Sequence, residues 1–554
     1  MTRRLFAALA LTALVALPAS ARDGGTISPD RLAAHVKALG DPSFAGRAPG
    51  GPGEQKTIDY LVGQFKALGL QPAGDNGGWT QEVSLYRFVV PADAGFTLRV
   101  GGLDRALVQT TDIMAASQRP VDRVTIDKAP LVFVGYGVSA PERGWDDFKG
   151  VDLKGKIAVF LINDPDFEAQ PGDAVAGTFG GKAATYYARW SYKYEEAVRR
   201  GAIGALIVHE TAGAAYPWTT VVASNGESFD VVREHPEAAK LLLQGWIQRD
   251  LAADLFRKAG LDFEAEKARA RTAGFTPVTL AGASFSADYA LKVDRLVSHN
   301  VLAKIPGATH PDESIMFGAH WDAFGIGPAD ATGDTVRHGA ADDAIGVAGV
   351  IELARAFKAG PAPQRSLVFT VWTAEERGLL GSEYYAEHPG FPLAKTVANF
   401  TMDVLQTAGP SRDVVLVGAG QNSLEQDLTR AAALQGRTVT PDAHPERALF
   451  YRADHFSVAK RGVPVLLLMG IGGGPDLVEG GREAGDRWVT EYTTKCYHQP
   501  CDVWSPAWDL RGAAADVDLL FTAGGALANS RLWPEWNDGS EFRAVRARTA
   551  GERK

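Results

Sequence analysis

Apolar and polar residues along this chain form two kinds of pattern, one with a helical period and one of short apolar runs. Ser28-Pro29-Asp30 opens a first helix, and a second helical pattern over residues 58–68 ends at Gly69. Short β-branched runs from residue 129 on predict strands, and from residue 299 on such strands alternate with longer helical patterns. This alternation indicates an α/β sheet covered by helices on both faces. The predicted strands span residues 131–134, 156–161, 204–208, 300–305, 314–318, 367–372, 396–402, 414–417 and 463–469, and the predicted helices include 344–358 and 517–527.

The same change of texture predicts the domain organisation. A core formed by residues 22–115 and 286–535 is interrupted by a β-rich stretch, residues 116–285, that contains no cluster of His and acidic residues. The residues after Trp536 are polar, so we expect a loose tail over 536–554.

The N-terminal residues have the three parts of a secretory signal. Arg3 and Arg4 precede an apolar run from Leu5 to Leu17, and small residues follow up to Ala21. We therefore expect residues 1–21 to be removed and the protein to be exported, either to the periplasm or into the medium. No later apolar run approaches the roughly 20 residues of a membrane span, so we expect no integral membrane segment in the mature chain.

Composition and charge narrow the function further. The chain has 554 residues, of which 45% are hydrophobic and 22% charged, and this length allows a large core and more than one domain. Its formal net charge of -9, without any run rich in Lys and Arg, argues against a nucleic-acid partner. The oligomeric state cannot be predicted from these features.

Two adjacent acids, Glu375 and Glu376, follow the strand predicted over residues 367–372. Neighbouring side chains on a regular strand point to opposite faces, so both can serve one site only where the strand gives way to a turn. There one carboxylate could bind a cation while the other accepts a proton. The alternative is a solvated pair at the start of a helix, where the helix dipole favours acids.

Four further stretches place possible metal ligands after strands or in Gly-rich loops, where open α/β sheets bind ligands. The two histidines and several carboxylates suit zinc, and the excess of carboxylates suggests two metals about 3.5 to 4 Å apart that share a bridging acid. His209 and His235 stand alone, and His209-Glu210 does not continue into a zinc-binding helix motif. The four stretches are Gly318-Ala-His320-Trp-Asp322, Gly339-Ala-Ala-Asp342-Asp343-Ala-Ile-Gly346, Met402-Asp403 and Tyr497-His498.

Together with Ala374-Glu375-Glu376-Arg-Gly378-Leu-Leu-Gly381-Ser382, this set resembles the di-zinc aminopeptidase and glutamate carboxypeptidase family. The resemblance implies a zinc-peptidase core with a mixed central sheet and two Zn2+ ions per chain. It also implies the ligands: His320 and Asp403 for one zinc, Glu376 and His498 for the other, and Asp342 as the bridge between them.

The resemblance assigns roles to residues around these ligands. Glu375 would be the general base for a water nucleophile, and Asp322 would orient His320 from behind. Tyr497 is similar to a tyrosine that some members direct at the oxyanion, although a packing role for its ring is the alternative. A cis peptide between Asp342 and Asp343 is also implied.

Two other segments resemble parts of such enzymes. Cys496-Tyr-His-Gln-Pro-Cys501 is similar to a disulfide-closed segment of secreted bacterial aminopeptidases, which implies a Cys496–Cys501 bridge around His498. Val132-Phe-Val-Gly-Tyr-Gly137 and Leu153-Lys-Gly-Lys-Ile157 resemble the protease-associated domain inserted in many such enzymes. That domain could cover the cleft, select substrates or only stabilise the fold.

The function implied is that of an exported zinc aminopeptidase acting on peptides with a free N-terminus. A dipeptidase or carboxypeptidase on the same core is the nearest alternative, because Arg447 and Arg452 could hold a substrate carboxylate. A glutaminyl cyclase is more remote. A catalytically silent, receptor-like binding protein is an alternative of a different class. The presence of Glu375 argues against it, because a protein without catalysis needs no general base.

Overall fold

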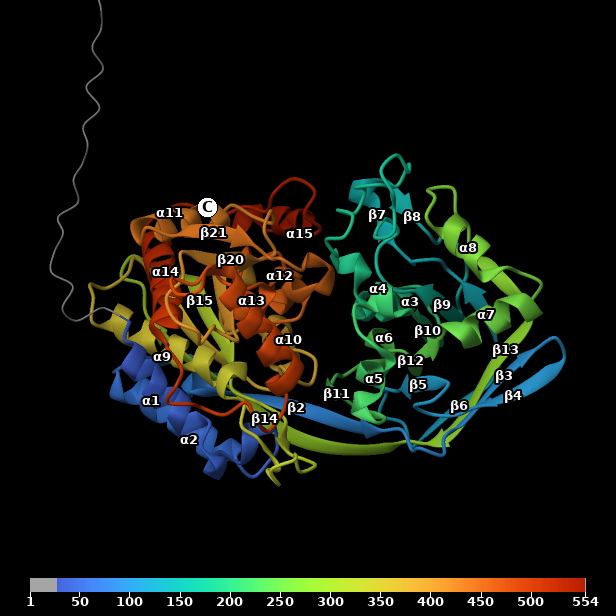
Figure 1. The fold of residues 1–554 in the computed structure, drawn as a ribbon, viewed down its shortest axis with the longest axis horizontal. Coiled ribbons are helices and arrows are strands. Elements are labelled where there is room, and N and C mark those ends of the chain that lie inside the picture. The colour runs from blue at the N-terminus through green and yellow to red at the C-terminus, as the bar shows by residue number, and fades with distance from the viewer. Residues whose placement is uncertain (1–26, 554) are drawn as a thin grey trace, which may run out of the picture.

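The computed structural model describes residues 27–553, which form two lobes side by side (Figure 1). Each lobe is built on its own large sheet with its own apolar core. The predicted signal segment, residues 1–21, lies outside the described residues. In residues 27–553, none of the helices combines the length and the apolar character that crossing a membrane requires.

The first lobe contains a ten-stranded mixed sheet with the order β11-β2-β14-β18-β15-β19-β22-β20-β21, and β1 pairs with β14. Strands β18, β15, β19 and β22 run parallel, so their carboxyl ends meet at one edge. The strands are β1 Gln71–Pro72, β2 Thr80–Val89, β11 Glu227–Val231, β14 Lys292–Ile305, β15 His310–His320, β18 Arg365–Trp372, β19 Thr396–Asp403, β20 Asp413–Val417, β21 Thr438–Pro441 and β22 Val465–Met469.

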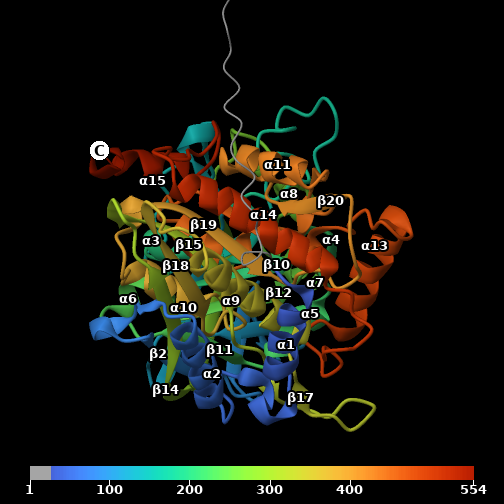
Figure 2. The ribbon, with the colours of Figure 1, turned by 90° about the vertical axis from the view of Figure 1, so that its left-hand side faces the viewer.

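Helices cover both faces of this sheet, as predicted. Along β15, Ile315 and Phe317 face the core shared with α9 and α14, whereas Met316 faces the core shared with α10 and α12. Figure 2 shows α1, α2, α9 and α14 on one side of the lobe. The helices of this lobe are α1 Pro29–Leu39, α2 Glu54–Ala67, α9 Ile345–Lys358, α10 Leu380–Glu387, α11 Leu424–Leu434, α12 His455–Ala459, α13 Gly481–Glu491, α14 Arg511–Ala528 and α15 Arg543–Arg548.

The second lobe contains an eight-stranded sheet with the order β4-β3-β13-β6-β9-β10-β12-β5. Its strands are β3 Gly95–Val100, β4 Leu103–Leu107, β5 Ile113–Ala116, β6 Arg123–Phe133, β9 Ile157–Leu161, β10 Gly204–His209, β12 Leu243–Gln248 and β13 Val278–Ala290. Its helices are α3 Trp190–Arg199, α4 Thr211–Ala214, α5 Trp218–Val221, α6 Pro236–Ala239, α7 Arg249–Lys258 and α8 Phe263–Ala270, and β7 Ser139–Ala140 pairs with β8 Trp145–Asp146 outside the sheet.

The second lobe does not have the boundaries predicted for the insertion, residues 116 and 285. The second sheet begins with β3 at Gly95 and ends with β13 at Ala290. Within the predicted insertion, β11 pairs with β2 and so belongs to the first sheet. Sheet membership depends on partners far away in sequence, and the local pattern of apolar residues does not encode them. Whether the second lobe is a protease-associated domain stays a prediction.

The lobes are joined in two places. The antiparallel pair of β2 and β14 runs along the lower edge of Figure 1 from the first lobe toward the second. Tyr186 of the second lobe packs on Tyr451 of the first, with ring centroids 6.2 Å apart. Glu541 accepts hydrogen bonds from both residues, from the Tyr186 amide at 3.2 Å and the Tyr451 hydroxyl at 2.9 Å.

The expectation of a loose tail after Trp536 is wrong. Trp536, Phe542 and Arg546 are buried, and the Trp536 and Phe542 rings lie 4.9 Å apart. Arg546 donates a hydrogen bond to the Thr396 carbonyl at 3.1 Å. A few buried anchors hold the segment although most of its residues are polar.

Candidate metal centre

The predicted site residues meet at the carboxyl edge of the parallel strands. His320 is the last residue of β15, and Asp403 is the last residue of β19. Glu375 and Glu376 follow β18 within a few residues, and Asp342 lies in the short helical segment Ala340–Ala344 just before α9. Because the strands are parallel, side chains far apart in sequence converge here.

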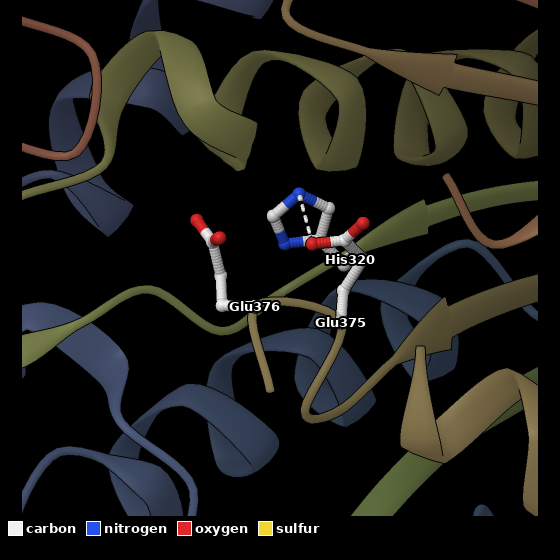
Figure 3. A group of neighbouring side chains, drawn as sticks. All are labelled: His320, Glu375 and Glu376. Carbon is white, nitrogen blue, oxygen red and sulfur yellow. Dashed lines mark ion pairs between the residues drawn. The ribbon is translucent and has the colours of Figure 1, made fainter. Parts of the chain in front are cut away.

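The turn after β18 directs both acids to the same side. Ala374, between the strand and the acids, has a φ of 53°, in the left-handed region that breaks the alternation of a strand. The Asp322 carboxylate accepts hydrogen bonds from the amides of Glu375 at 3.0 Å and Glu376 at 3.3 Å. Both carboxylates therefore extend toward the side on which His320 lies (Figure 3), with Glu375 3.9 Å from its Nε2.

Three groups of possible ligand atoms occur among the described residues: two share Asp342, and the third combines His320, Glu375 and Glu376. His320 Nε2 lies 3.2 Å from Asp342 Oδ1 and 3.9 Å from Asp403 Oδ1. His498 Nε2 lies 3.1 Å from Asp342 Oδ2 and 3.3 Å from Glu376 Oε2. In each group the ligand atoms lie within 4.8 Å of one another, which one metal ion could bridge.

The polar atoms that face one another in these groups have no hydrogen-bond partner. This holds for His320 Nε2, Asp342 Oδ2, Glu376 Oε1 and His498 Nε2, all of which are buried. His320 Nδ1 donates to the Asp322 carbonyl at 3.0 Å, which leaves the lone pair on Nε2. Buried polar groups are normally satisfied, so four orphaned atoms within the two groups that share Asp342 fit a site for metal ions.

Charge leads to the same conclusion. Burial raises the pKa of Asp403 to about 7, and the negative charge of Asp342 adds to this. Burial also raises the pKa of Glu376 well above its usual value, and the charges of Asp342 and Glu375 raise it further. Crowded buried carboxylates repel one another, and a divalent cation would offset that repulsion. The residues therefore fit the two zinc ions that the sequence implies.

Comparison with known proteins identifies the part of the chain that carries this site. Residues 300–522 match the model of peptidase family M28. This part of the chain belongs to that family. A probable zinc metalloprotease of Pyrenophora teres f. teres is 42% identical over 87 residues, which are 16% of this chain and 18% of that protein. Leupeptin-inactivating enzyme 1 of Streptomyces exfoliatus is 28% identical over 250 residues, or 44% of this chain and 50% of that protein.

The matches to these relatives thus span half of their length or less. Among solved structures, an aminopeptidase from Aneurinibacillus sp. strain AM-1 aligns with 90% of this chain and 93% of its own, at 20% identity and a TM-score of 0.47. A zinc aminopeptidase from Bacillus subtilis aligns with 93% of this chain and 99% of its own, at 18% identity and a TM-score of 0.43.

In the M28 part, Asp322 supports the site differently from the prediction. The group that binds His320 Nδ1 is the Asp322 backbone carbonyl, whereas its carboxylate Oδ1 is 3.7 Å from that nitrogen. The carboxylate instead fixes the amides of Glu375 and Glu376, so one residue orients both a histidine and the two acids. The sequence could not reveal this, because the backbone path after β15 decides whether the carbonyl or the carboxylate of Asp322 reaches His320.

The roles of two further carboxylates of the M28 part were not predicted from the sequence. Asp343 accepts from the amides of Gly346 at 3.0 Å and Val404 at 3.2 Å, which ties α9 to the end of β19. Asp502 accepts from the amides of Ala341 at 2.9 Å and Asp342 at 3.1 Å. The peptide between Asp342 and Asp343 is cis, as the resemblance implies.

His498 is held by a disulfide and by aromatic rings. Cys496 and Cys501 are bonded, which confirms the predicted bridge around His498. The His498 ring lies 4.4 Å from the Phe324 ring and 3.7 Å from the Tyr497 ring, measured between centroids. Tyr497 thus packs on a predicted ligand, and its role toward an oxyanion stays a prediction.

The residues of the M28 site differ in burial. His320 and Asp403 are buried, whereas Glu376 and His498 are half-buried and line a small pocket with Phe324. Asp454 is a further buried carboxylate, which the sequence did not single out, and its charge acts on Glu375. Burial raises the pKa of Glu375, the His320 imidazole opposes this, and the charges of Asp403 and Asp454 add to the increase. A cation bound beside it would favour the ionised form that a base needs.

Proposed function

We propose that this chain is an exported, zinc-dependent exopeptidase, and specifically an aminopeptidase that hydrolyses N-terminal residues from peptides. The observation that carries the proposal is the pair of ligand groups that share Asp342, with Glu375 beside them and outside the predicted ligand set. When bound, zinc supplies Lewis-acid chemistry that polarises a peptide carbonyl and makes a water molecule more acidic.

The chain's own residues perform the remaining tasks. Glu375 accepts the proton of the attacking water and passes it to the leaving amine. Asp322 holds the Glu375 amide and so fixes where this carboxylate points. The rings of Tyr497 and Phe324 pack against the His498 ring and so help to hold it in place. Export is supported by the N-terminal pattern and by the Cys496–Cys501 bridge, since disulfides persist in oxidising compartments.

The preference for a free N-terminus is supported by the acidic character of the site. A substrate ammonium group can bind beside the carboxylates, which places the first peptide carbonyl at the reacting centre. One observation favours a dipeptidase or carboxypeptidase instead. Arg452 has no ion pair among residues 27–553. Its positive charge lowers the pKa of Asp403, although burial and the charge of Asp342 raise that pKa by more.

The deciding experiment compares a free peptide with its amino-acetylated and carboxy-amidated forms in the presence of zinc. We expect release of the first amino acid from the free and amidated forms. The acetylated form should react at least about tenfold more slowly, because it loses a charge-assisted hydrogen bond that contributes ~1.5–3 kcal/mol. The Glu375→Gln protein, prepared in the same way, controls for contaminating peptidases.

The opposite pattern would reassign the substrate end. If cleavage survives acetylation and is abolished by amidation, Arg452 becomes the candidate for the substrate carboxylate and the enzyme is a carboxypeptidase. If both blocked forms resist cleavage while the free dipeptide reacts, it is a dipeptidase. No cleavage of any form by zinc-loaded protein would favour the binding protein.

A further inference from the structure

Arg47 is a fully buried arginine that connects two segments next to predicted metal ligands: the His320 loop (residues 320–323, from the end of β15) and the Asp342 loop (residues 338–342, before α9). Its side chain is 0% exposed. Its Nε donates to the carbonyl of Trp321, the residue after His320, at 2.7 Å. Its Nη2 donates to the carbonyl of Gly339, which precedes Asp342 by three residues, at 2.7 Å. One rigid guanidinium therefore spans the His320 loop and the Asp342 loop.

The other contacts of Arg47 strengthen this connection. Its Nη1 donates to the His338 carbonyl at 2.6 Å and to the Leu39 carbonyl, at the end of α1, at 2.8 Å. The backbone carbonyl of Arg47 accepts from the Ala323 amide at 3.4 Å. Four of the five N–H donors of the side chain thus bind backbone carbonyls, and a lysine, with its single nitrogen, cannot reproduce that pattern.

The backbone around Arg47 has an unusual conformation. Ala45, Gly46 and Arg47 have φ values of 49°, 66° and 49°. A Cβ on Gly46 would lie 2.6 Å from the Gly325 carbonyl oxygen and 2.7 Å from the Arg337 carbonyl oxygen. The segment therefore occupies a narrow gap beside the metal loops, and the left-handed conformations are unfavourable for residues other than glycine.

The hydrogen-bond partners of the Arg47 guanidinium are all backbone carbonyls and include no carboxylate. Among residues 27–553, no carboxylate forms an ion pair with it. Burial lowers the pKa of the guanidinium, and the charges of Asp502, Asp322 and Asp343 oppose this. Burying a charge without an ionic partner is costly, and the charges of these nearby carboxylates offset part of that cost.

We propose that Arg47 is a positioning residue of the metal centre, which sets zinc affinity by holding the His320 loop and the Asp342 loop at one separation. The proposal rests on the zinc centre of the proposed function. Its alternative is a purely structural role, in which Arg47 stabilises the fold and leaves the metal site unaffected.

Arg365 provides a matched control. It is also 0% exposed, and its Nε donates to Glu313 at 2.7 Å while its Nη1 donates to the Leu527 and Leu532 carbonyls. It stands at the start of β18, whereas Glu375 and Glu376 follow the end of that strand. An Arg→Lys change at this position disturbs a buried guanidinium at the end of β18 that is opposite to the metal site.

The experiment compares the wild type, Arg47→Lys and Arg365→Lys, with Arg47→Gln as a second variant. Each protein is stripped of metal, its folding is checked by circular dichroism and thermal unfolding, and zinc chloride is titrated against a competing chelator. We expect Arg47→Lys to bind zinc about 10- to 100-fold more weakly than the wild type, as for other residues that support metal ligands. Arg365→Lys should unfold at lower temperature and bind zinc normally.

Each outcome decides a separate point. If the wild type binds no zinc, the zinc centre itself is wrong. If the wild type binds zinc and Arg47→Lys binds it equally well, only the positioning role is wrong. An equal loss of affinity in Arg365→Lys, or failure of both Arg47 variants to fold, would assign Arg47 to the fold and overturn the proposal.

Discussion

The Glu375→Gln variant is expected to keep both zinc ions and to lose peptide hydrolysis by about 10²- to 10⁴-fold, the contribution of a positioned general base. Glutamine preserves the size of the side chain and removes the proton acceptor. Glu375 lies 3.9 Å from His320 Nε2 and forms a third possible ligand group with His320 and Glu376, but it belongs to neither of the groups that share Asp342, to which the predicted ligands belong. The measurement is kcat for the zinc-loaded protein at a metal content equal to that of the wild type.

Glu376→Ala is the contrasting variant. Its carboxylate lies 3.3 Å from His498 Nε2 and carries an oxygen without a hydrogen-bond partner, so its removal should lower zinc content. Of the two adjacent glutamates, Glu375 would then control turnover and Glu376 would control zinc content. Near-normal turnover by Glu375→Gln at matched zinc content would show that the proton acceptor has been assigned wrongly.

Asp342→Ala is expected to lose both metal ions and to reduce hydrolysis to the background rate. The two Asp342 oxygens face different histidines, with Oδ1 3.2 Å from His320 and Oδ2 3.1 Å from His498. Removal of a shared ligand should therefore empty both positions, whereas His498→Ala should weaken only one. Zinc per folded chain, measured after dialysis against a weak chelator, tests this difference.

Asp312→Ala is the matched control for Asp342→Ala. Asp312 lies in β15, is largely exposed and pairs with Lys395, away from the carboxyl edge of the sheet. It should leave zinc content and hydrolysis unchanged. An Asp342→Ala protein that still holds two zinc ions would contradict the bridging role.

The strands and the position of the site could be predicted because they depend on local patterns. The apolar run ending at Trp372 is a strand, and the two acids that follow it meet the other ligands because parallel strands end at one edge. The turn that brings both acids to one side was expected in general terms, and Ala374 supplies it. The excess of carboxylates suggests two metals with a bridging acid, whereas the assignment of individual ligands to each metal comes from the family resemblance.

The remaining features depend on contacts between distant segments. β11 returns to the first sheet through pairing with β2, which lies more than a hundred residues earlier in the chain. Arg47 reaches the carbonyls of Trp321 and Gly339 through a backbone conformation that a loop rich in Gly and Pro does not specify. The tail is held by Trp536 and Arg546, whose partners Gly462 and Thr396 cannot be identified from a polar segment.

The most direct test of this account is a zinc titration of the metal-free protein in which bound zinc and peptide hydrolysis are measured in the same samples. The account predicts no hydrolysis without metal and full activity when two zinc ions are bound per chain, since the two ligand groups share Asp342. Full hydrolysis by rigorously metal-free protein, or zinc binding that leaves peptides uncleaved, would contradict it.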